Sequence, residues 1–142
     1  MNNLQFNNYA EMLDFNRQEV EAFPLFYAFT DEALNEGMQR LGVDNFNDIC
    51  KVGWATFIQK TDFNAYVEMI EQQQARKEEA FKDDSFLKNA LIYELFNHEY
   101  SYTLEPESAI EALGFQMQEI ENNKRFMKIL KQAEKYVLDK SC

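Results

Sequence analysis

Residues 25–42 read LFYAFTDEALNEGMQRLG, and this stretch decides the fold class. Its first part, Leu25 to Phe29, is apolar and aromatic and too short for a typical helix, which predicts a strand. Thr30 follows as a residue whose side chain can cap a helix, and two acidic residues come next, where the helix dipole favours them. Apolar residues then recur at helical spacing until Gly42. We therefore predict a strand followed by a helix over residues 31–41.

A second, looser copy of this arrangement follows along the chain. Residues 54–58, WATFI, are typical of a strand, and Thr61 and Asp62 begin another helical pattern. A lone strand leaves its backbone groups unpaired, so we expect the two strands to form one small sheet. The direction of pairing stays open, because the intervening helix could serve a parallel crossover or be a long insertion between antiparallel strands.

Helical spacing of apolar residues accounts for most of the remaining chain. Further helices are predicted over residues 5–22, 62–81, 85–97 and 106–113, the third of them central and buried. A last helix carries Phe126, Leu130, Ala133 and Val137 on one side and Lys124, Lys128, Lys131 and Lys135 on the other. With 142 residues, two prolines and four glycines, the chain is expected to be α+β and mostly α. We predict four to six helices around a two-stranded sheet, in one compact domain over residues 1–142.

The charge balance limits the classes of partner. The chain has 25 acidic and 14 basic residues, a net charge of −11, which repels nucleic acid and anionic membranes. We therefore expect no direct binding to either. The longest apolar stretch, Phe23 to Phe29, is too short to span a membrane, and no secretion signal is visible. Cys50 and Cys142 make no disulfide framework, so we expect a reducing, cytosolic setting.

Few residues suggest catalysis. The chain has one histidine, His98, which would share a helix face with Glu94. A small metal-assisted enzyme centred on His98 is one alternative, but no second histidine and no His-Glu-x-x-His spacing supports it. The other reading is that His98 and Tyr100 pack at a helix C-terminus. Nucleophile and phosphate-loop motifs are missing, so we predict a non-enzymatic protein with no catalytic residue, no metal ligand and no cofactor.

The acidic residues are unevenly distributed. Residues 1–50 have a net charge of −7, and seven acidic residues but no basic one lie between Lys88 and Lys124, interleaved with aromatic residues. Carboxylates at such spacing can occupy the lysines and arginines with which another protein meets phosphates, while aromatic side chains anchor the contact. The candidate partner-binding residues are Glu99, Tyr100, Tyr102, Glu105, Glu107 and Glu111, with Asp31, Glu32 and Glu36 as a second patch.

Two other interpretations of this surface stay open. An acidic surface can serve only to keep a small protein dissolved. The 21 aromatic residues could also exceed what one core needs, which would favour a self-associating structural or regulatory protein.

Several short segments carry a resemblance. They are FYAFTDE (26–32), GMQRLG (37–42), KTD (60–62), ELFNHEY (94–100) and AIEALG (109–114). Over about residues 23–115 the chain resembles a group of small uncharacterised proteins of bacteriophages and mobile elements. The resemblance implies an origin and no activity. Compact acidic phage proteins are similar to anti-defence inhibitors, among them anti-CRISPR proteins that bind the guide- or DNA-contacting surface of a nuclease.

That resemblance shapes the functional prediction. We expect an interaction protein that inhibits a host nucleic-acid-handling enzyme, such as a CRISPR effector nuclease, by binding its basic surface through an acidic, aromatic face. The lysines of the last helix depart from a uniformly acidic mimic and limit how much of the surface could act in this way.

Overall fold

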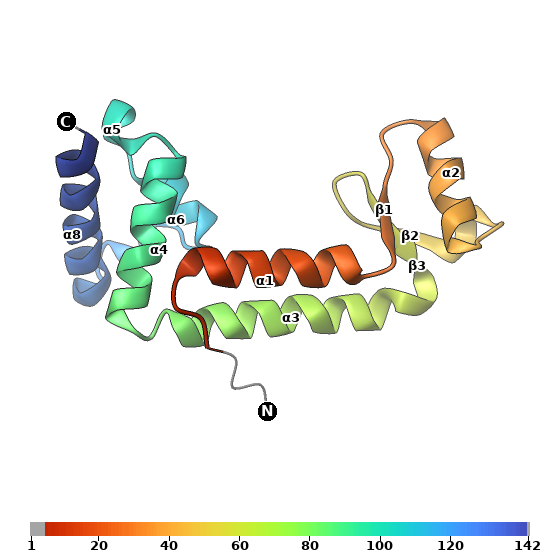
Figure 1. Cartoon of the computed structure of the whole chain (residues 1–142), viewed down its shortest axis with the longest axis horizontal. Coiled ribbons are helices and arrows are strands. Elements are labelled where there is room, and N and C mark those ends of the chain that lie inside the picture. Colours follow the sequence, from red (N-terminus) through yellow and green to blue (C-terminus); the bar gives the residue numbers. More distant parts are fainter. Residues whose placement is uncertain (1–4, 142) are drawn as a thin grey trace. The chain divides into compact units, whose positions relative to one another are not determined.

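The computed structural model describes residues 5–141, and its contacts divide the chain into two compact units. Unit 1 comprises Met1–Asp14 and Arg76–Cys142, and unit 2 comprises Phe15–Ala75. The unit boundaries fall within helices α1 (Tyr9–Ala22) and α3 (Phe63–Ala80) (Figure 1). The expectation of one compact domain is not tested by this division and stays a prediction. Cys142 lies outside the described residues, and Cys50 is a free, half-buried thiol.

The described residues form eight α-helices and three strands. The remaining helices are α2 (Asp31–Leu41), α4 (Asp84–Asn97), α5 (Tyr100–Thr103), α6 (Glu107–Ala112), α7 (Met117–Ile120) and α8 (Lys124–Ser141). The strands are β1 (Leu25–Tyr27), β2 (Ile49–Gly53) and β3 (Thr56–Gln59). The mostly helical α+β class is confirmed. The expected four to six helices and two strands are corrected, because α5 and α7 are single turns too short to show a period and β2 was not predicted.

The sheet of unit 2 has the order β1-β3-β2, and both neighbouring pairs are antiparallel. This settles the pairing direction that the sequence left open. The predicted strands at 25–29 and 54–58 were partly wrong at their ends, since Phe29 lies beyond β1 and Trp54 lies in the turn between β2 and β3. Ala55 completes that turn with a left-handed backbone (φ 55°), and its carbonyl accepts the N–H of Ala28 at 2.9 Å.

Helix α2 packs on one face of this sheet. Thr30 caps it by accepting the N–H of Ala33 at 3.1 Å, and Gly42 ends it in the left-handed region, both as predicted. The helix approaches β1 so closely at Gly37 that a Cβ there would overlap the Phe26 ring. Four buried residues of unit 2 form one cluster, Phe26, Met38, Val43 and Ile49, and Ala55 and Ile58 are also buried.

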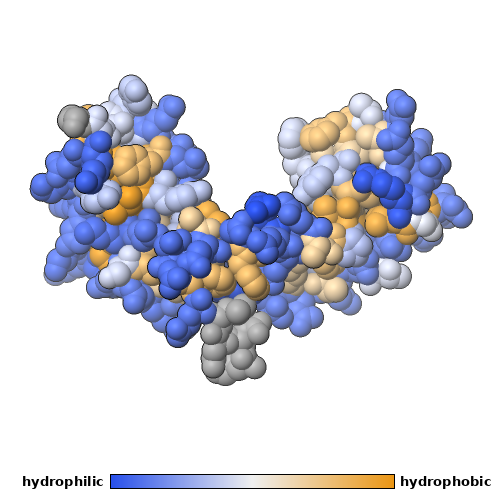
Figure 2. All heavy atoms as spheres, viewed as in Figure 1, coloured by the Kyte–Doolittle hydropathy of each residue, from blue (hydrophilic) through white to orange (hydrophobic). Residues whose placement is uncertain are grey.

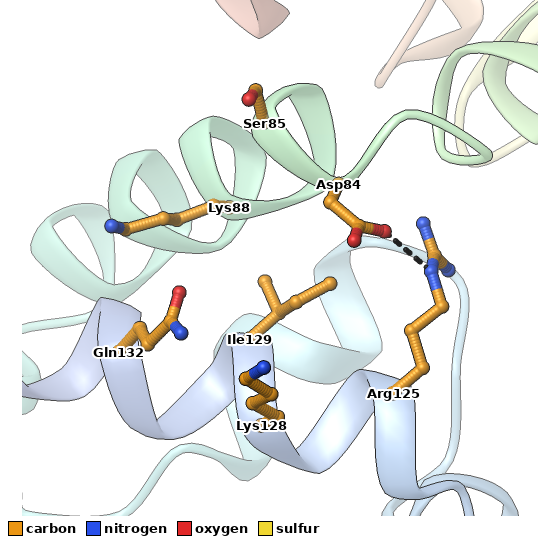
Figure 3. A pocket seen from close by; sticks show the side chains of 7 residues that line it. All are labelled: Asp84, Ser85, Lys88, Arg125, Lys128, Ile129 and Gln132. Carbon is orange, nitrogen blue, oxygen red and sulfur yellow. Dashed lines mark hydrogen bonds and ion pairs between the residues drawn. The ribbon is translucent and has the colours of Figure 1, made fainter.

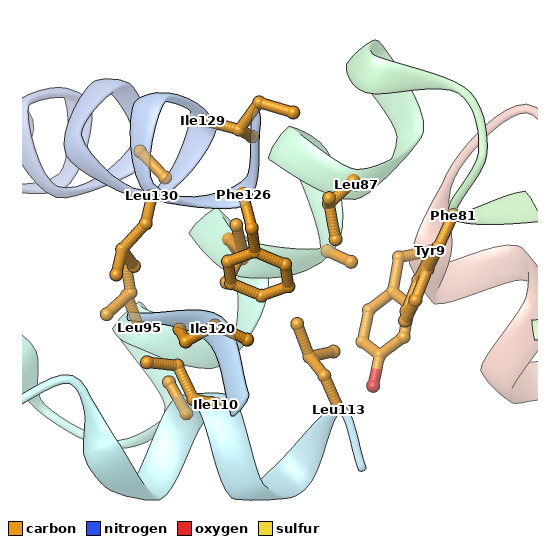
Figure 4. Packing of buried hydrophobic residues seen from close by; sticks show 14 of the residues in the cluster. Tyr9, Phe81, Leu87, Leu95, Ile110, Leu113, Ile120, Phe126, Ile129 and Leu130 are labelled. Atoms are coloured by element: carbon orange, nitrogen blue, oxygen red, sulfur yellow. The ribbon is translucent and has the colours of Figure 1, made fainter. Parts of the chain in front are cut away.

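Unit 1 is organised around α4, as its continuous apolar face predicted. Leu87, Ala90, Leu91 and Leu95 of this helix are all buried. Helix α8 packs along α4 with its apolar side inward, and its predicted lysine side is exposed. Seventeen buried residues make one cluster, part of which Figure 4 shows between α4, α6 and α8. This cluster holds the rest of unit 1 in place, including the short turn α5.

Candidate partner-binding surfaces

Two exposed aromatic rings contact one another beside the start of α2. Phe29 follows β1 and is 69% exposed, and Trp54 occupies the β2–β3 turn and is 83% exposed. Their ring centroids lie 5.2 Å apart at an interplanar angle of 69°, an edge-to-face pair. Figure 2 shows orange hydrophobic surface exposed on unit 2 beside blue hydrophilic surface. The rings therefore form a pre-arranged apolar contact point in water.

The second predicted acidic patch lies on α2, the helix that follows Phe29. Asp31 and Glu32 occupy the first turn of α2, which begins two residues after Phe29, and both are exposed. Glu36 is exposed one helical turn beyond Glu32 on the same face. We call Phe29, Trp54, Asp31, Glu32 and Glu36 the α2 surface. Unit 2 as a whole has ten acidic and four basic residues, a net charge of −6.

The first predicted patch lies on and after α5, in unit 1. Glu99 and Leu104 bound this single turn, and both have a left-handed backbone, with φ of 57° and 58°. Such conformations are costly for residues other than glycine, and the surrounding packing must maintain them. The turn presents Tyr102, which is 87% exposed. Together with it, the exposed residues Glu99, Glu105, Glu107 and Glu111 make what we call the α5 surface.

Tyr100 does not belong to that exposed face, which corrects its predicted place. Its side chain points into the core of unit 1, because the left-handed backbone at Glu99 turns the chain inward at this residue. Burial, followed by a hydrogen bond with Glu134, raises the pKa of Tyr100 to about 12. Tyr100 therefore anchors α5 to the core and leaves Tyr102 as the exposed aromatic residue of the turn.

The carboxylates of both surfaces are free to meet a cation. None of the seven has an ion-pair partner within the described part of the chain, residues 5–141. An unpaired carboxylate in contact with water reduces the stability of the fold only slightly, and it makes the local electrostatic potential more negative. The two surfaces differ in their apolar part, which is a ring pair in the α2 surface and a single ring in the α5 surface.

His98 ends α4, as the packing interpretation predicted. Its backbone N–H donates to the carbonyl of Glu94 at 2.9 Å, and its Nε2 lies 4.0 Å from the Glu94 carboxylate. Glu94 is 6% exposed, and its carboxylate accepts hydrogen bonds from the Tyr9 hydroxyl at 2.9 Å and the Asn97 amide at 3.3 Å. Burial, and then the bond to Glu94, raises the pKa of Tyr9 well above its usual range. Residues 5–141 contain no group of three or more side chains suited to hold a metal ion.

Phe29 and Trp54 were absent from the predicted site. Because both residues are aromatic, their sequence pattern predicted strands, whose side chains are usually half-buried, and this prediction excluded them from an exposed site. A signal was nevertheless present, because Phe29 directly precedes the helix cap Thr30 and Trp54 directly follows Gly53. Both are positions where a chain changes direction at the surface.

Both surfaces lie within a region shared with other proteins. The family model described as a family of unknown function (DUF7659) matches residues 8–136. The chain belongs to the DUF7659 family. No curated protein and no solved structure matches it. The matched region of this DUF7659 protein includes the α2 surface, the α5 surface and most of α8. Among its described helices, none combines the length and apolar character that crossing a bilayer requires.

Proposed function

We propose that this DUF7659 protein is a non-enzymatic interaction protein that binds the basic surface of a nucleic-acid-handling enzyme through the α2 surface and inhibits that enzyme. The observation that carries the proposal is the exposed Phe29–Trp54 ring pair beside three unpaired carboxylates. The resemblance to phage and mobile-element proteins suggests a CRISPR effector nuclease as one such enzyme.

The chemistry of the α2 surface suits a cationic partner. Large aromatic side chains supply most of the energy in many interfaces, because a few well-packed rings exclude water from the contact. The surrounding carboxylates would steer a basic surface into place and exclude acidic ones. Arginine side chains can also stack on exposed rings, with indole the strongest acceptor. A protein surface that already holds phosphates through arginine and lysine offers all of these contacts.

A capture experiment with matched variants tests the proposal. The full chain is used as bait in a lysate of the cells that make it, and the bound proteins are identified and purified. The α2 variant carries Trp54→Ala and Glu36→Lys. The control carries Tyr102→Ala and Glu111→Lys on the α5 surface, so each variant loses one exposed ring and reverses one charge.

We expect a nucleic-acid-handling enzyme that binds the wild type and the control but not the α2 variant. Duplex DNA should compete with the protein for that enzyme, and the protein should lower its activity. Undiminished binding of the α2 variant would overturn the assigned surface. Simultaneous binding of DNA and the protein to the enzyme would overturn the inhibitory mimicry, whichever surface is used.

A further inference from the structure

A groove between α4 and α8 in unit 1 has a lining of the opposite charge to the rest of the molecule. Its volume is about 460 Å³, within the range of small-ligand sites. The charged side chains of the lining are Lys88, Arg125, Lys128 and Asp84, and Gln132 and Ile129 are among the others (Figure 3). The net charge of the lining is thus +2 in a chain whose net charge is −11.

Arg125 is held in place at one end of the groove. Its Nε donates to the Asp84 carboxylate at 2.6 Å, and its terminal nitrogen donates to the carbonyls of Phe81 and Lys82 at 2.8 Å and 3.1 Å. These bonds fix the turn between α3 and α4 against α8. They also neutralise the one carboxylate of the lining, so that it does not compete for the lysines.

Lys88 and Lys128 are the two cations of the lining that remain uncompensated. Lys88 comes from α4 and Lys128 from α8, and neither has an ion-pair partner among residues 5–141. Another lysine of α8, Lys135, is instead paired with Asp139 at 3.0 Å. Asp84 is the one acidic residue of the lining, and it is paired with Arg125 and not with either lysine.

We propose that this groove binds a small anion that carries phosphate groups. Lysine ammonium groups bind phosphate oxygens through strong, charge-assisted hydrogen bonds, and here two helices supply one each. The Gln132 amide adds a neutral hydrogen-bonding group in the same lining. A diphosphate has two anionic groups, one for each lysine of the lining. This site on α4 and α8 shares no residue with either partner-binding surface and does not depend on the proposed function.

Calorimetric titration of the full chain with inorganic pyrophosphate at low ionic strength tests this site. The variants are Lys88→Gln and Lys128→Gln, and the matched control is Lys135→Gln on the same helix. We expect one saturable site in the wild type and in the control. Each groove variant should weaken binding about tenfold, the loss typical of one charge-assisted hydrogen bond.

A parallel titration with ADP distinguishes the two sources of a diphosphate. Binding of ADP at least tenfold tighter than pyrophosphate would assign a nucleotide, and equal binding would assign the free anion. Either result supports the site. Two results would overturn it: the lack of saturable binding by the wild type, and equal weakening by Lys135→Gln, which would show a diffuse charge effect along α8.

Discussion

The two units use their apolar residues differently. Unit 1 gathers seventeen buried residues in one cluster, whereas the cluster in unit 2 has four. Five aromatic side chains of unit 2 are exposed, namely Tyr27, Phe29, Phe46, Trp54 and Phe63. Because these rings are exposed, they add less to the stability of unit 2 than buried rings would. Unit 1 also exposes four aromatic side chains, namely Tyr93, Phe96, Tyr102 and Tyr136, so the two units differ mainly in the size of the buried cluster.

The largest expected effect concerns the core of unit 1. Leu91→Ala removes a completely buried side chain on α4, and we expect it to lower the free energy of unfolding by about 2–5 kcal/mol. Urea denaturation followed by circular dichroism measures this loss. Hydrogen exchange should place the lost protection in α4 and α8. If the free energy of unfolding fell by less than about 1 kcal/mol, unit 1 would not be tightly packed, which would contradict the contrast between the two cores.

A smaller loss is expected from crowding in unit 2. Gly37→Ala gains helix propensity, but the new Cβ would overlap the Phe26 ring. We expect a net destabilisation of about 1–2 kcal/mol, since overpacking outweighs the gain in propensity. Hydrogen exchange along α2 and β1 measures it. The matched change Asn35→Ala on the exposed side of α2 should not destabilise the unit, and an equal loss there would contradict the packing argument.

Alkaline pH provides a third contrast between the units. Tyr9 and Tyr100 both belong to unit 1, and both have a raised pKa in the folded chain. An unfolded tyrosine loses its proton near pH 10, so the stability they contribute is complete below that pH. This contribution to stability is lost as the pH rises to about 12 and beyond, where the folded tyrosines lose their protons. Tyrosinate absorbance and urea denaturation against pH measure this, and Tyr100→Phe should flatten the decline. If stability fell with pH in Tyr100→Phe as steeply as in the wild type, Tyr100 would not be a source of the decline.

The smallest effect on stability is expected at the α2 surface. Trp54→Ala removes a larger side chain than Leu91→Ala does, but that side chain is mostly exposed. We therefore expect a change in the free energy of unfolding within about 0.5 kcal/mol. Urea denaturation beside the Leu91 variant makes the comparison direct. If Trp54→Ala lowered the free energy of unfolding about as much as Leu91→Ala does, the ring pair would be a structural contact of unit 2, which would contradict its assignment to partner binding.

Local signals predicted the helices well. The bounds of α2 were predicted correctly because Thr30 caps the helix and Gly42 ends it, and both act within a few residues. Strand β2 was missed because Lys51 and Gly53 are weak strand formers, and this segment becomes a strand only by pairing with β3. Pairing between strands depends on the whole fold, which a local pattern does not contain.

The candidate site was predicted less completely. The predicted α2 placed Asp31, Glu32 and Glu36 on a surface that a partner could reach, and all three side chains are exposed in the structure. Tyr100 was assigned to the partner-binding face, and its burial favours the alternative interpretation that packs it near His98. The left-handed backbone at Glu99 leaves no mark in an apolar pattern. The groove lysines come from helices far apart in the sequence, so only the packing of α4 against α8 brings them into one lining.

Trp54 is the sole tryptophan of the chain and is largely in contact with water. The tryptophan fluorescence of the chain therefore originates from one place, the α2 surface. An indole in water emits at long wavelength, and loss of that water shifts the emission to the blue. Any molecule that covers the Phe29–Trp54 pair would therefore be detected without a label, through a blue shift of the Trp54 emission.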